Sequence, residues 1–309
     1  MRVFQKPSEA AAAFPGAIMA LGNFDGVHLG HRALFEVACQ QAKDRNQPWG
    51  VVTFEPHPAR VLAPELAPRL ITTPQGKLDL IRESAPDLTL VLPFTQGLSR
   101  MTPDQFVNDV LVRQLRPSAL VVGHDFTFGS GRAGTVSDLR DMAATHDFQV
   151  HVLDPFAIHG MVVSSTKVRA FVLSGRVYAA SLLLGRPFVL TGPVIRGDGR
   201  GKTIGFPTAN IDAEQELLPS AGVYACWFDV KGHHMPAAVN VGRLPTFRAD
   251  GILTVEAHVL DWSGDLYGQR VSIEFVRRIR QERRFASPDE LAKQIQLDLA
   301  RTREVLLKL

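Results

Sequence analysis

The sequence predicts an α/β domain with a mainly parallel sheet over residues 1–185, followed over residues 186–309 by an all-β antiparallel domain that ends in a helix. Three observations lead to this prediction. The chain of 309 residues is about twice as long as a typical domain. Up to residue 185, short apolar runs alternate with longer amphipathic ones, which is typical of βαβ units. Beyond Arg186-Pro187, short β-branched and aromatic runs follow one another, separated by Gly and Pro.

The expected elements of the first domain are buried strands and amphipathic helices in alternation. Runs with the length and composition of buried strands are found at 17–21, 49–54, 88–92 and 119–122. Amphipathic stretches of helical spacing are found at 31–42 and 103–114. Because helices separate the strands, the strands are expected to lie parallel in one sheet.

The second domain is expected to be an antiparallel sandwich or barrel. Runs of strand composition follow closely at 189–194, 222–230, 237–241, 253–260 and 269–276. A helix is expected at 288–307, because Ser-Pro-Asp-Glu at 287–290 supplies an N-cap, a first-turn proline and a capping box. Leu291, Ile295 and Leu299 share one face of this helix and are expected to pack on the barrel.

Composition excludes several classes of protein. Hydrophobic residues make up 45% and charged residues 21% of the chain, which excludes a disordered chain, a collagen-like fibre and a disulfide scaffold. The net charge of +3 is too small for a general nucleic-acid binder. The two cysteines, Cys39 and Cys226, suit a reducing compartment, so the cytoplasm is expected. No apolar run approaches the roughly 20 residues that span a bilayer, and Pro15 and Gly16 interrupt the stretch 10–21, so the N-terminus is expected to be mature.

The first candidate site is the segment 22–31, which reads GNFDGVHLGH and joins an expected strand to an expected helix. Glycine lets the backbone approach a ligand, and a helix N-terminus offers free N–H groups and a positive dipole end. His28 and His31 lie one turn apart, so both can face a phosphate bound there. The segment predicts a phosphate cradle; the alternative is a helix-capping histidine beside a surface histidine. Metal binding is not expected, because no further ligands lie nearby in the sequence.

Three further segments follow expected strands, at the sheet edge where parallel-sheet enzymes place their ligand loops. They read TFEPHP at 53–58, GHDFTFG at 123–129 and VVSSTKVR at 162–169. The hydroxyls of the last segment suit a helix cap. With Arg169 in the first turn they also suit a polyphosphate, because a cation there stabilises the charge that gathers on leaving pyrophosphate.

In the second domain, the segment 192–210 reads GPVIRGDGRGKTIGFPTAN and contains a glycine-rich turn. It is not a P-loop, because Arg196 stands where that motif has its first glycine and Pro207 would end the helix that must follow. A glycine-rich turn between antiparallel strands can still wrap a triphosphate with its backbone N–H groups. The alternative is a mobile hairpin. A Ser–His–Asp hydrolase is not expected, because the sequence has no G-x-S-x-G turn.

The four segments of the first half resemble, in order, the adenylyltransferase half of the prokaryotic bifunctional riboflavin kinase/FAD synthetase family. Segments that resemble its kinase half are 207–210, 238–242, 245–247, 255–261 and 277–285, and Trp262 stands where the family more often has Phe. The resemblance implies a Rossmann-like nucleotidyltransferase domain followed by a Greek-key-like barrel with a C-terminal helix. It also implies two ATP-dependent activities: phosphorylation of riboflavin to FMN, and adenylylation of FMN to FAD with release of pyrophosphate.

The resemblance implies roles for residues of the first half. His28, His31 and Arg169 would act on the phosphates during adenylylation. This step needs alignment and charge relief rather than a strong base, because the FMN phosphate is already anionic. The residues implied in ATP binding are Gly22, Asn23, Phe24, Asp25, Gly30, Ser164, Ser165 and Thr166. The residues implied on the FMN side, or near a metal, are His57 and Asp125, together with Phe128 on the FMN side.

In the second half the resemblance implies Glu256 as the catalytic base; the alternative is an acid at a strand edge or hairpin. A primary alcohol is a poor nucleophile at neutral pH, so a kinase needs a carboxylate to accept its proton. Thr208 and Asn210 would hold Mg²⁺. The residues implied in ATP binding are Gly197, Gly199, Gly201, Lys202, Thr203, Gly205 and Pro207. The residues implied in flavin binding are Asn240, Arg280 and Glu282.

Two other functions remain open at this point. One is a non-catalytic flavin or nucleotide sensor that has kept both pockets. The other is an adenylyltransferase for a different phosphate ester with an RNA-binding barrel, which is disfavoured because the second half lacks a basic stripe interleaved with aromatic residues. The expected partners are the small molecules ATP, riboflavin and FMN, with neither nucleic acid nor membrane, and the chain is expected to be a monomer or a weak homo-oligomer.

Overall fold

The computed structural model describes residues 1–197, 205–243 and 253–308 of the chain. Internal contacts divide it into two compact units, Met1–Pro68 with Thr72–Ser164 and Arg69–Ile71 with Ser165–Leu309. Each unit is described by itself. The domain limits expected from the sequence, 1–185 and 186–309, stay a prediction.

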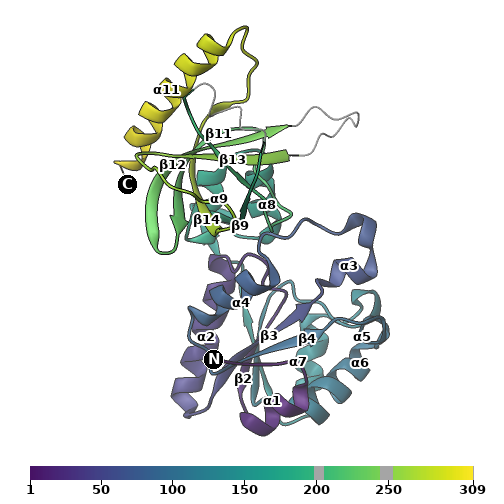
Figure 1. Ribbon diagram of the computed structural model, residues 1–309. Coiled ribbons are helices and arrows are strands. Elements are labelled where there is room, and N and C mark those ends of the chain that lie inside the picture. Colours follow the sequence, from purple (N-terminus) through teal and green to yellow (C-terminus); the bar gives the residue numbers. More distant parts are fainter. Residues whose placement is uncertain (198–204, 244–252, 309) are drawn as a thin grey trace. The chain divides into compact units, whose positions relative to one another are not determined.

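The first unit is built on a parallel sheet of six strands in the order β1-β4-β3-β2-β5-β6 (Figure 1). The strands are β1 (Arg2–Phe4), β2 (Ile18–Leu21), β3 (Trp49–Glu55), β4 (Leu88–Pro93), β5 (Ala119–Gly123) and β6 (Gln149–Leu153). The chain adds β3 and β4 on one side of β2, and β5 and β6 on the other. Ligands of such sheets bind at the carboxyl ends of the strands, beside the point where the strand order changes direction.

Helices cover both faces of this sheet (Figure 1). Ile18 and Ala20 of β2 pack in one apolar cluster with α2 and α4, whereas Met19 and Leu21 pack in the other with α1, η2 and α7. This alternation follows from the two-residue period of a strand. The helices are α1 (Pro7–Ala13), α2 (Leu29–Arg45), α3 (Pro58–Leu62), η1 (Pro64–Leu66), α4 (Pro74–Arg82), α5 (Gln96–Arg100), α6 (Pro103–Gln105), the π-helical η2 (Phe106–Leu115), η3 (Ser130–Arg132) and α7 (Val136–Ala144). A hairpin of β7 (Ala157–Ile158) and β8 (Met161–Val162) completes the unit.

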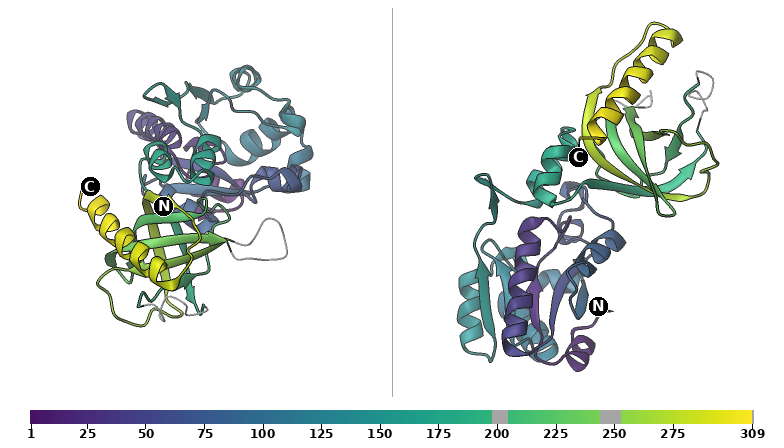
Figure 2. Two further views of the ribbon diagram at one scale, coloured as in Figure 1. Left: turned by 90° about the horizontal axis from the view of Figure 1, so that it is seen from above. Right: turned by 90° about the vertical axis from the view of Figure 1, so that its left-hand side faces the viewer.

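The second unit is a closed antiparallel barrel preceded by two helices and followed by one (Figure 2). The barrel order is β10-β13-β12-β11-β14-β9. Its elements are α8 (Ser165–Leu173), α9 (Val177–Leu184), β9 (Phe188–Ile195), β10 (Ala209–Ile211), β11 (Gly222–Val230), β12 (His233–Arg243), β13 (Leu253–Val259), β14 (Arg270–Gln281) and α11 (Pro288–Leu306). The predicted fold class is therefore confirmed: a parallel sheet between helices, then an antiparallel barrel with a terminal helix.

The terminal helix α11 packs against β11, β12 and β14. Ser287 caps it by accepting a hydrogen bond from the Glu290 amide at 3.2 Å, as expected from the sequence. The buried residues of the helix differ from those expected: Leu291, Ile295 and Leu299 are half-buried, and Asp298, Thr302 and Leu306 are buried. Asp298 is buried because it pairs with an arginine of β14.

Two bulges in β14 give α11 its apolar contacts. The register with β11 skips one residue between Val223 and Tyr224 and another between Ala225 and Cys226, and these extra residues are Ile279 and Val276 of β14. A bulge re-aims the side chain of the extra residue. Both residues pack in one apolar cluster with Val305 and Leu306 of α11.

Candidate functional site

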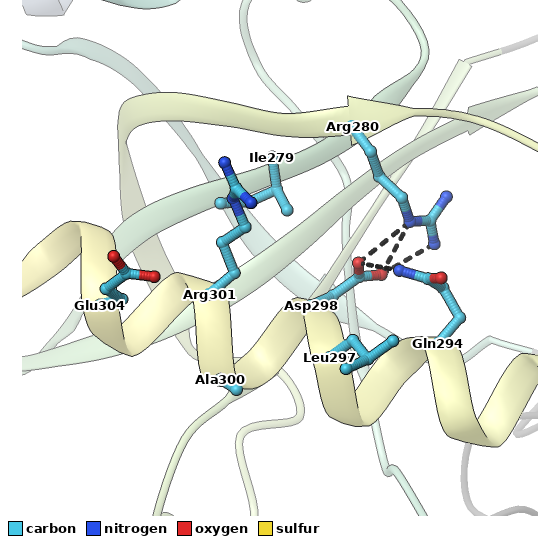
Figure 3. Close-up of a pocket in the computed structure, with 8 residues that line it drawn as sticks. All are labelled: Ile279, Arg280, Gln294, Leu297, Asp298, Ala300, Arg301 and Glu304. Carbon is cyan, nitrogen blue, oxygen red and sulfur yellow. Dashed lines mark hydrogen bonds and ion pairs between the residues drawn. The ribbon is translucent and has the colours of Figure 1, made fainter.

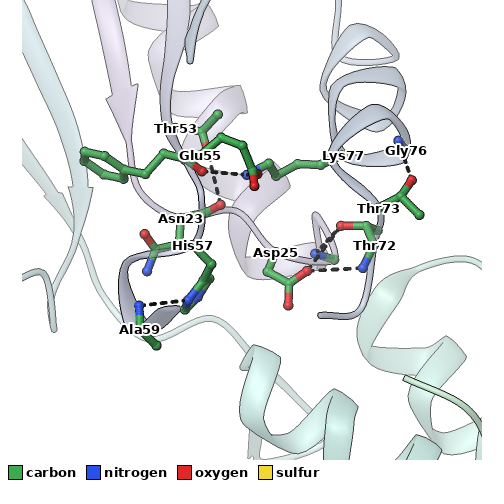
Figure 4. Close-up of polar contacts among 12 residues, drawn as sticks. Asn23, Asp25, Thr53, Glu55, His57, Ala59, Thr72, Thr73, Gly76 and Lys77 are labelled. Carbon is green, nitrogen blue, oxygen red and sulfur yellow. Dashed lines mark hydrogen bonds and ion pairs between the residues drawn. The ribbon is translucent and has the colours of Figure 1, made fainter. Parts of the chain in front are cut away.

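The segment 22–31 joins β2 to α2, at the edge of the sheet where a ligand is expected. Its backbone has positive φ at Phe24 (52°), Gly26 (84°) and Val27 (39°). For residues other than glycine this conformation is strained, and such strain is concentrated at functional loops. Thr72 holds the loop in place (Figure 4): its amide and hydroxyl each donate to Oδ1 of Asp25 at 3.2 Å, and its Oγ1 accepts from the Gly26 amide at 3.3 Å.

The two histidines of this loop lie together at the N-terminus of α2. Nδ1 of His28 accepts a hydrogen bond from the His31 amide at 3.2 Å, and the two rings stack with 3.5 Å between centroids. His28 therefore caps α2, as the alternative interpretation of this segment predicted. Because Nδ1 is an acceptor, the proton of the neutral His28 ring lies on Nε2, where it can be donated to a phosphate oxygen.

Phe24 and Gly30 shape the surroundings of these rings. The Phe24 ring is 1% exposed and packs edge-on against His31, with 5.1 Å between centroids, so it supports this histidine from the core. A Cβ atom on Gly30 would lie 3.2 Å from Cε1 and 3.3 Å from Nδ1 of His28. Glycine at this position thus leaves room for the capping imidazole.

The other predicted residues of the first unit follow the neighbouring strands. Asn23 accepts a hydrogen bond from the Thr53 hydroxyl at 2.9 Å through its carbonyl, which joins the loop after β2 to the carboxyl-terminal part of β3. His57 caps α3 by accepting from the Ala59 amide at 3.2 Å (Figure 4). Asp125 lies exposed in the turn after β5.

The Phe128 ring is 6% exposed and lies between Phe106 and Phe126, with 5.8 Å between centroids on each side. It belongs to the apolar cluster under the sheet, and little of it is accessible. Its predicted contact with FMN stays a prediction.

The predicted pyrophosphate residues straddle the division between the two units. Ser164 is the last residue of the first unit, and Ser165, Thr166 and Arg169 begin α8 of the second. Nε of Arg169 donates to the carbonyl of Arg69 at 3.0 Å. Their roles in ATP binding stay predictions.

A buried lysine beside this site was missed from the sequence. The side chain of Lys77 in α4 is 9% exposed; its Nζ donates to the Phe54 carbonyl at 3.0 Å and lies 3.6 Å from Oε2 of Glu55 (Figure 4). Burial lowers the pKa of Lys77, while the carboxylates of Glu55 and Asp25 oppose this shift. Nothing in the sequence marks Lys77, which there reads as an ordinary helical lysine.

In the second unit, a row of polar side chains crosses three neighbouring strands. Glu256 of β13 is paired directly with Asn210 of β10 on one side and with Asn240 of β12 on the other. Directly opposite residues of an antiparallel pair point to the same face. The neighbours of Glu256, Val255 and Ala257, are 2% and 1% exposed, so the row faces away from the barrel core.

Two neighbouring residues complete this row. Oγ1 of Thr208 lies 3.5 Å from Oε2 of Glu256. A Cβ atom on Gly197 would lie 2.2 Å from Nδ2 of Asn210, so only glycine leaves room for that amide. The structure therefore brings together Glu256, Thr208, Asn210 and Gly197, which were all predicted from the sequence.

Glu282 lies beside Asn240. A Cβ atom on Gly242 would meet Nδ2 of Asn240 at 3.0 Å and Oε1 of Glu282 at 3.4 Å. Both residues predicted to bind the flavin therefore have their side chains next to Gly242. The carbonyl of Pro207 lies 2.8 Å from Nδ1 of His258, a contact that sequence reasoning did not anticipate. The remaining predicted ATP residues are Gly205, which has a φ of 86°, and Gly199, Gly201, Lys202 and Thr203, which lie outside the described residues.

Arg280 lies in a groove of about 510 Å³ between β14 and α11 (Figure 3). Its Nε lies 3.1 and 2.9 Å from the two carboxylate oxygens of Asp298, and its Nη2 lies 2.8 Å from Oδ2. Gln294 donates to the same carboxylate at 2.7 Å. Arg280 thus fastens α11 to the barrel; its predicted flavin contact stays a prediction.

Comparisons with known proteins give a family match for each half of the chain. One family model, described as FAD synthetase, matches residues 11–167, and another, described as riboflavin kinase, matches residues 184–306. The "Bifunctional riboflavin kinase/FMN adenylyltransferase" of Escherichia coli (strain K12) is 38% identical over 291 residues, which cover 94% of this chain and 92% of the relative. The protein of the same name from Bacillus subtilis (strain 168) is 34% identical, over 91% of this chain and 90% of the relative.

A solved structure from Streptococcus pneumoniae, described as a macrolide-efflux protein, is also similar. It has a TM-score of 0.86 and 30% sequence identity over 97% of this chain and 98% of that chain. Its description names efflux, whereas the family models and the curated relatives name enzymes. Within the described residues, no helix is both long enough and apolar enough to cross a membrane.

Fold, sites and comparisons define a two-unit transferase of the phosphate-transferring class. The chain belongs to the bifunctional riboflavin kinase/FMN adenylyltransferase family. The family, the fold and the enzyme classes expected from the sequence, a kinase joined to a nucleotidyltransferase, are thereby confirmed.

Proposed function

We propose that this chain makes FAD in two ATP-dependent steps: the barrel phosphorylates riboflavin to FMN, and the first unit adenylylates FMN. The observation that carries the proposal is the row Asn210–Glu256–Asn240 on the outer face of the barrel, with the Thr208 hydroxyl beside the carboxylate. Matches to both family models along one chain support the second activity.

In the kinase step, Glu256 accepts the proton of the riboflavin 5′-hydroxyl as that oxygen attacks the γ-phosphate of ATP, and the bond from the γ-phosphorus to the bridging oxygen breaks with release of ADP. Asn240 and Glu282 hold the flavin, and the glycine-rich turn with Gly197, Gly205 and Pro207 binds the phosphates. The proposal includes the ATP contacts predicted for Gly199, Gly201, Lys202 and Thr203. It also includes the flavin contact predicted for Arg280.

Mg²⁺ belongs to the proposal as the cation of the kinase site. The donor set fits it, because the Thr208 hydroxyl and the Asn210 amide oxygen are hard oxygen ligands, and the Thr208 hydroxyl also lies 3.5 Å from a carboxylate oxygen. Bound there, Mg²⁺ would neutralise phosphate charge. Thr208 and Asn210 would hold it by their oxygens and orient the triphosphate toward Glu256.

In the adenylyl step, a phosphate oxygen of FMN attacks the α-phosphate of ATP, and pyrophosphate leaves. His28 and His31 at the N-terminus of α2 donate hydrogen bonds to the ATP phosphates, where the helix dipole also favours negative charge. Ser164, Ser165, Thr166 and Arg169 hold the leaving pyrophosphate. Gly22, Asn23, Asp25 and Gly30 form the cradle, and His57, Asp125 and Phe128 lie toward FMN.

We further propose the setting in which the enzyme acts. Its partners are the small molecules ATP, riboflavin and FMN, with neither nucleic acid nor membrane. It acts in the cytoplasm, in keeping with two free cysteines. It is a monomer or a weak homo-oligomer.

Incubation of the purified chain with riboflavin, ATP and Mg²⁺, with the products resolved by chromatography, tests the proposal. FMN is expected first and FAD after it. Absence of both products would favour a flavin or nucleotide sensor. Absence of both flavin products, together with adenylylation of a different phosphate ester and strong, salt-sensitive RNA binding, would favour the other alternative.

A further inference from the structure

Lys77 is a buried cation in the first unit that the proposed mechanism does not use. Lysine is almost never fully buried unless it is paired. Here both of its contacts lie at the carboxyl end of β3: the Phe54 carbonyl at 3.0 Å and Oε2 of Glu55 at 3.6 Å. The loop that carries His57 leaves the sheet at this end of β3.

The same short segment also holds the other ligand loop. Thr72, five positions before Lys77, makes the hydrogen bonds to Asp25 and Gly26 described above. Between them, Thr73 caps α4 by accepting from the Gly76 amide at 3.0 Å, which fixes the direction of the helix. The segment 72–77 is therefore a brace that contacts the β2 loop at one end and the carboxyl end of β3 at the other (Figure 4).

The charge of Lys77 has a second effect. Asp25 and Glu55 both act on its ammonium electrostatically. Their carboxylates stand beside a loop that is expected to bind polyphosphate, and uncompensated negative charge there would repel the substrates. Asp25 is 4% exposed, and a buried carboxylate that loses a compensating charge is unfavourable, so loss of the ammonium disturbs the loop that carries Asp25. The Glu55 side chain is 32% exposed, so there the loss chiefly leaves a negative charge uncompensated.

We propose that Lys77 is a positioning residue for FMN adenylylation: its ammonium fixes the end of β3 to the brace 72–77 and compensates the adjacent carboxylates. This inference rests on the proposed adenylyltransferase activity of the first unit. The kinase step, which belongs to the barrel, does not depend on it.

Lys77→Met, with the wild-type chain and Lys43→Met as controls, tests the proposal in the full-length protein. Lys43 is an exposed lysine in the last turn of α2. For Lys77→Met we expect kcat/KM of FMN adenylylation to fall about 10- to 100-fold, the range that misplaced reactive groups produce. Kinase kcat/KM of the same preparation, and both activities of Lys43→Met, should stay within about twofold of wild type, as expected for residues that take no part in those reactions.

The double variant Lys77→Met/Glu55→Gln separates positioning from a general loss of folding. It removes the uncompensated carboxylate, so adenylylation should recover at least about threefold over Lys77→Met, the size of coupling expected between contacting residues. Hydrogen exchange of Lys77→Met should be faster at residues 22–31 and 53–59 and unchanged in the rest of the sheet. This exchange pattern tests the brace even if the wild-type chain makes no FAD, an outcome that would refute the proposed activity instead.

Three outcomes would overturn the role of Lys77. The first is Lys77→Met with wild-type adenylylation. The second is a loss of adenylylation activity that is proportional to the loss of folded protein, with kcat and KM per folded molecule unchanged. The third is uniform exchange across the unit.

Discussion

Replacement of Gly197 by alanine tests the kinase site with a single methyl group. A Cβ atom on Gly197 would lie 2.2 Å from Nδ2 and 2.4 Å from Cγ of Asn210. Non-bonded heavy atoms settle near about 3.5 Å, so the amide must move by about 1 Å. Asn210 is paired with Glu256 across the sheet. Because a displacement of about 1 Å at a reacting centre costs about 10²-fold, kinase kcat/KM should fall by about 10²-fold.

The assay is chromatographic quantification of FMN formed from riboflavin and ATP, with adenylylation of supplied FMN as an internal control. Gly97→Ala in α5 is the matched control, since its Cβ would meet nothing closer than 3.5 Å. Adenylylation in Gly197→Ala, and both activities of Gly97→Ala, should remain at the wild-type level. A Gly197→Ala chain with full kinase activity would refute the requirement for Asn210 at this place. An equal loss of both activities would refute the expectation that Gly197→Ala affects only the kinase activity of the barrel.

Three further substitutions have defined outcomes. Glu256→Gln should lower kinase kcat by about 10²–10⁴-fold, the usual effect of losing a general base, and leave adenylylation of supplied FMN intact; steady-state rates of both reactions measure this. His28→Ala should do the converse, and unchanged FAD formation would remove His28 from the site. Asp298→Ala leaves the guanidinium of Arg280, whose side chain is 20% exposed, without its carboxylate, so it should destabilise the barrel by about 3 kcal/mol. Urea unfolding followed by Trp fluorescence measures that change, and a loss below about 0.5 kcal/mol, the range of ordinary surface substitutions, would contradict the reading of this ion pair.

The elements that position the sites were predictable because their signals are local. The apolar runs 17–21 and 49–54 became β2 and β3, and the glycine-rich segment after the first run became the loop into α2. The polar row of the barrel is a different case. Glu256, Asn210 and Asn240 were predicted from the family resemblance, whereas the register that places them side by side arises from pairing of strands that are distant in the sequence and was not predicted.

Other features depend on contacts between distant segments, and the sequence does not reveal these. Lys77 is buried because β3 ends beside it, and His258 meets the Pro207 carbonyl only once the barrel has closed. In α11 the apolar spacing favoured Leu291, Ile295 and Leu299 as the packed face. Asp298 became buried instead, because it pairs with Arg280 of β14.

Phe128 illustrates the limit of motif reasoning. Its place in a ligand-loop motif suggested contact with FMN, but a motif does not tell which of its aromatic rings points into the core. The structure buries this ring between Phe106 and Phe126. Little of the ring is therefore accessible, and its contact with FMN stays a prediction.

The most direct test of two independent catalytic units is to mix the Glu256→Gln and His28→Ala chains. Supplied with riboflavin, ATP and Mg²⁺, each variant alone should form FAD at no more than about 1% of the wild-type rate, because one of the two steps has lost its catalytic group. Their equimolar mixture should form it, because FMN released by the His28→Ala chain is a substrate for the Glu256→Gln chain. A mixture that forms no FAD, although each variant is folded and keeps its remaining activity, would contradict this account.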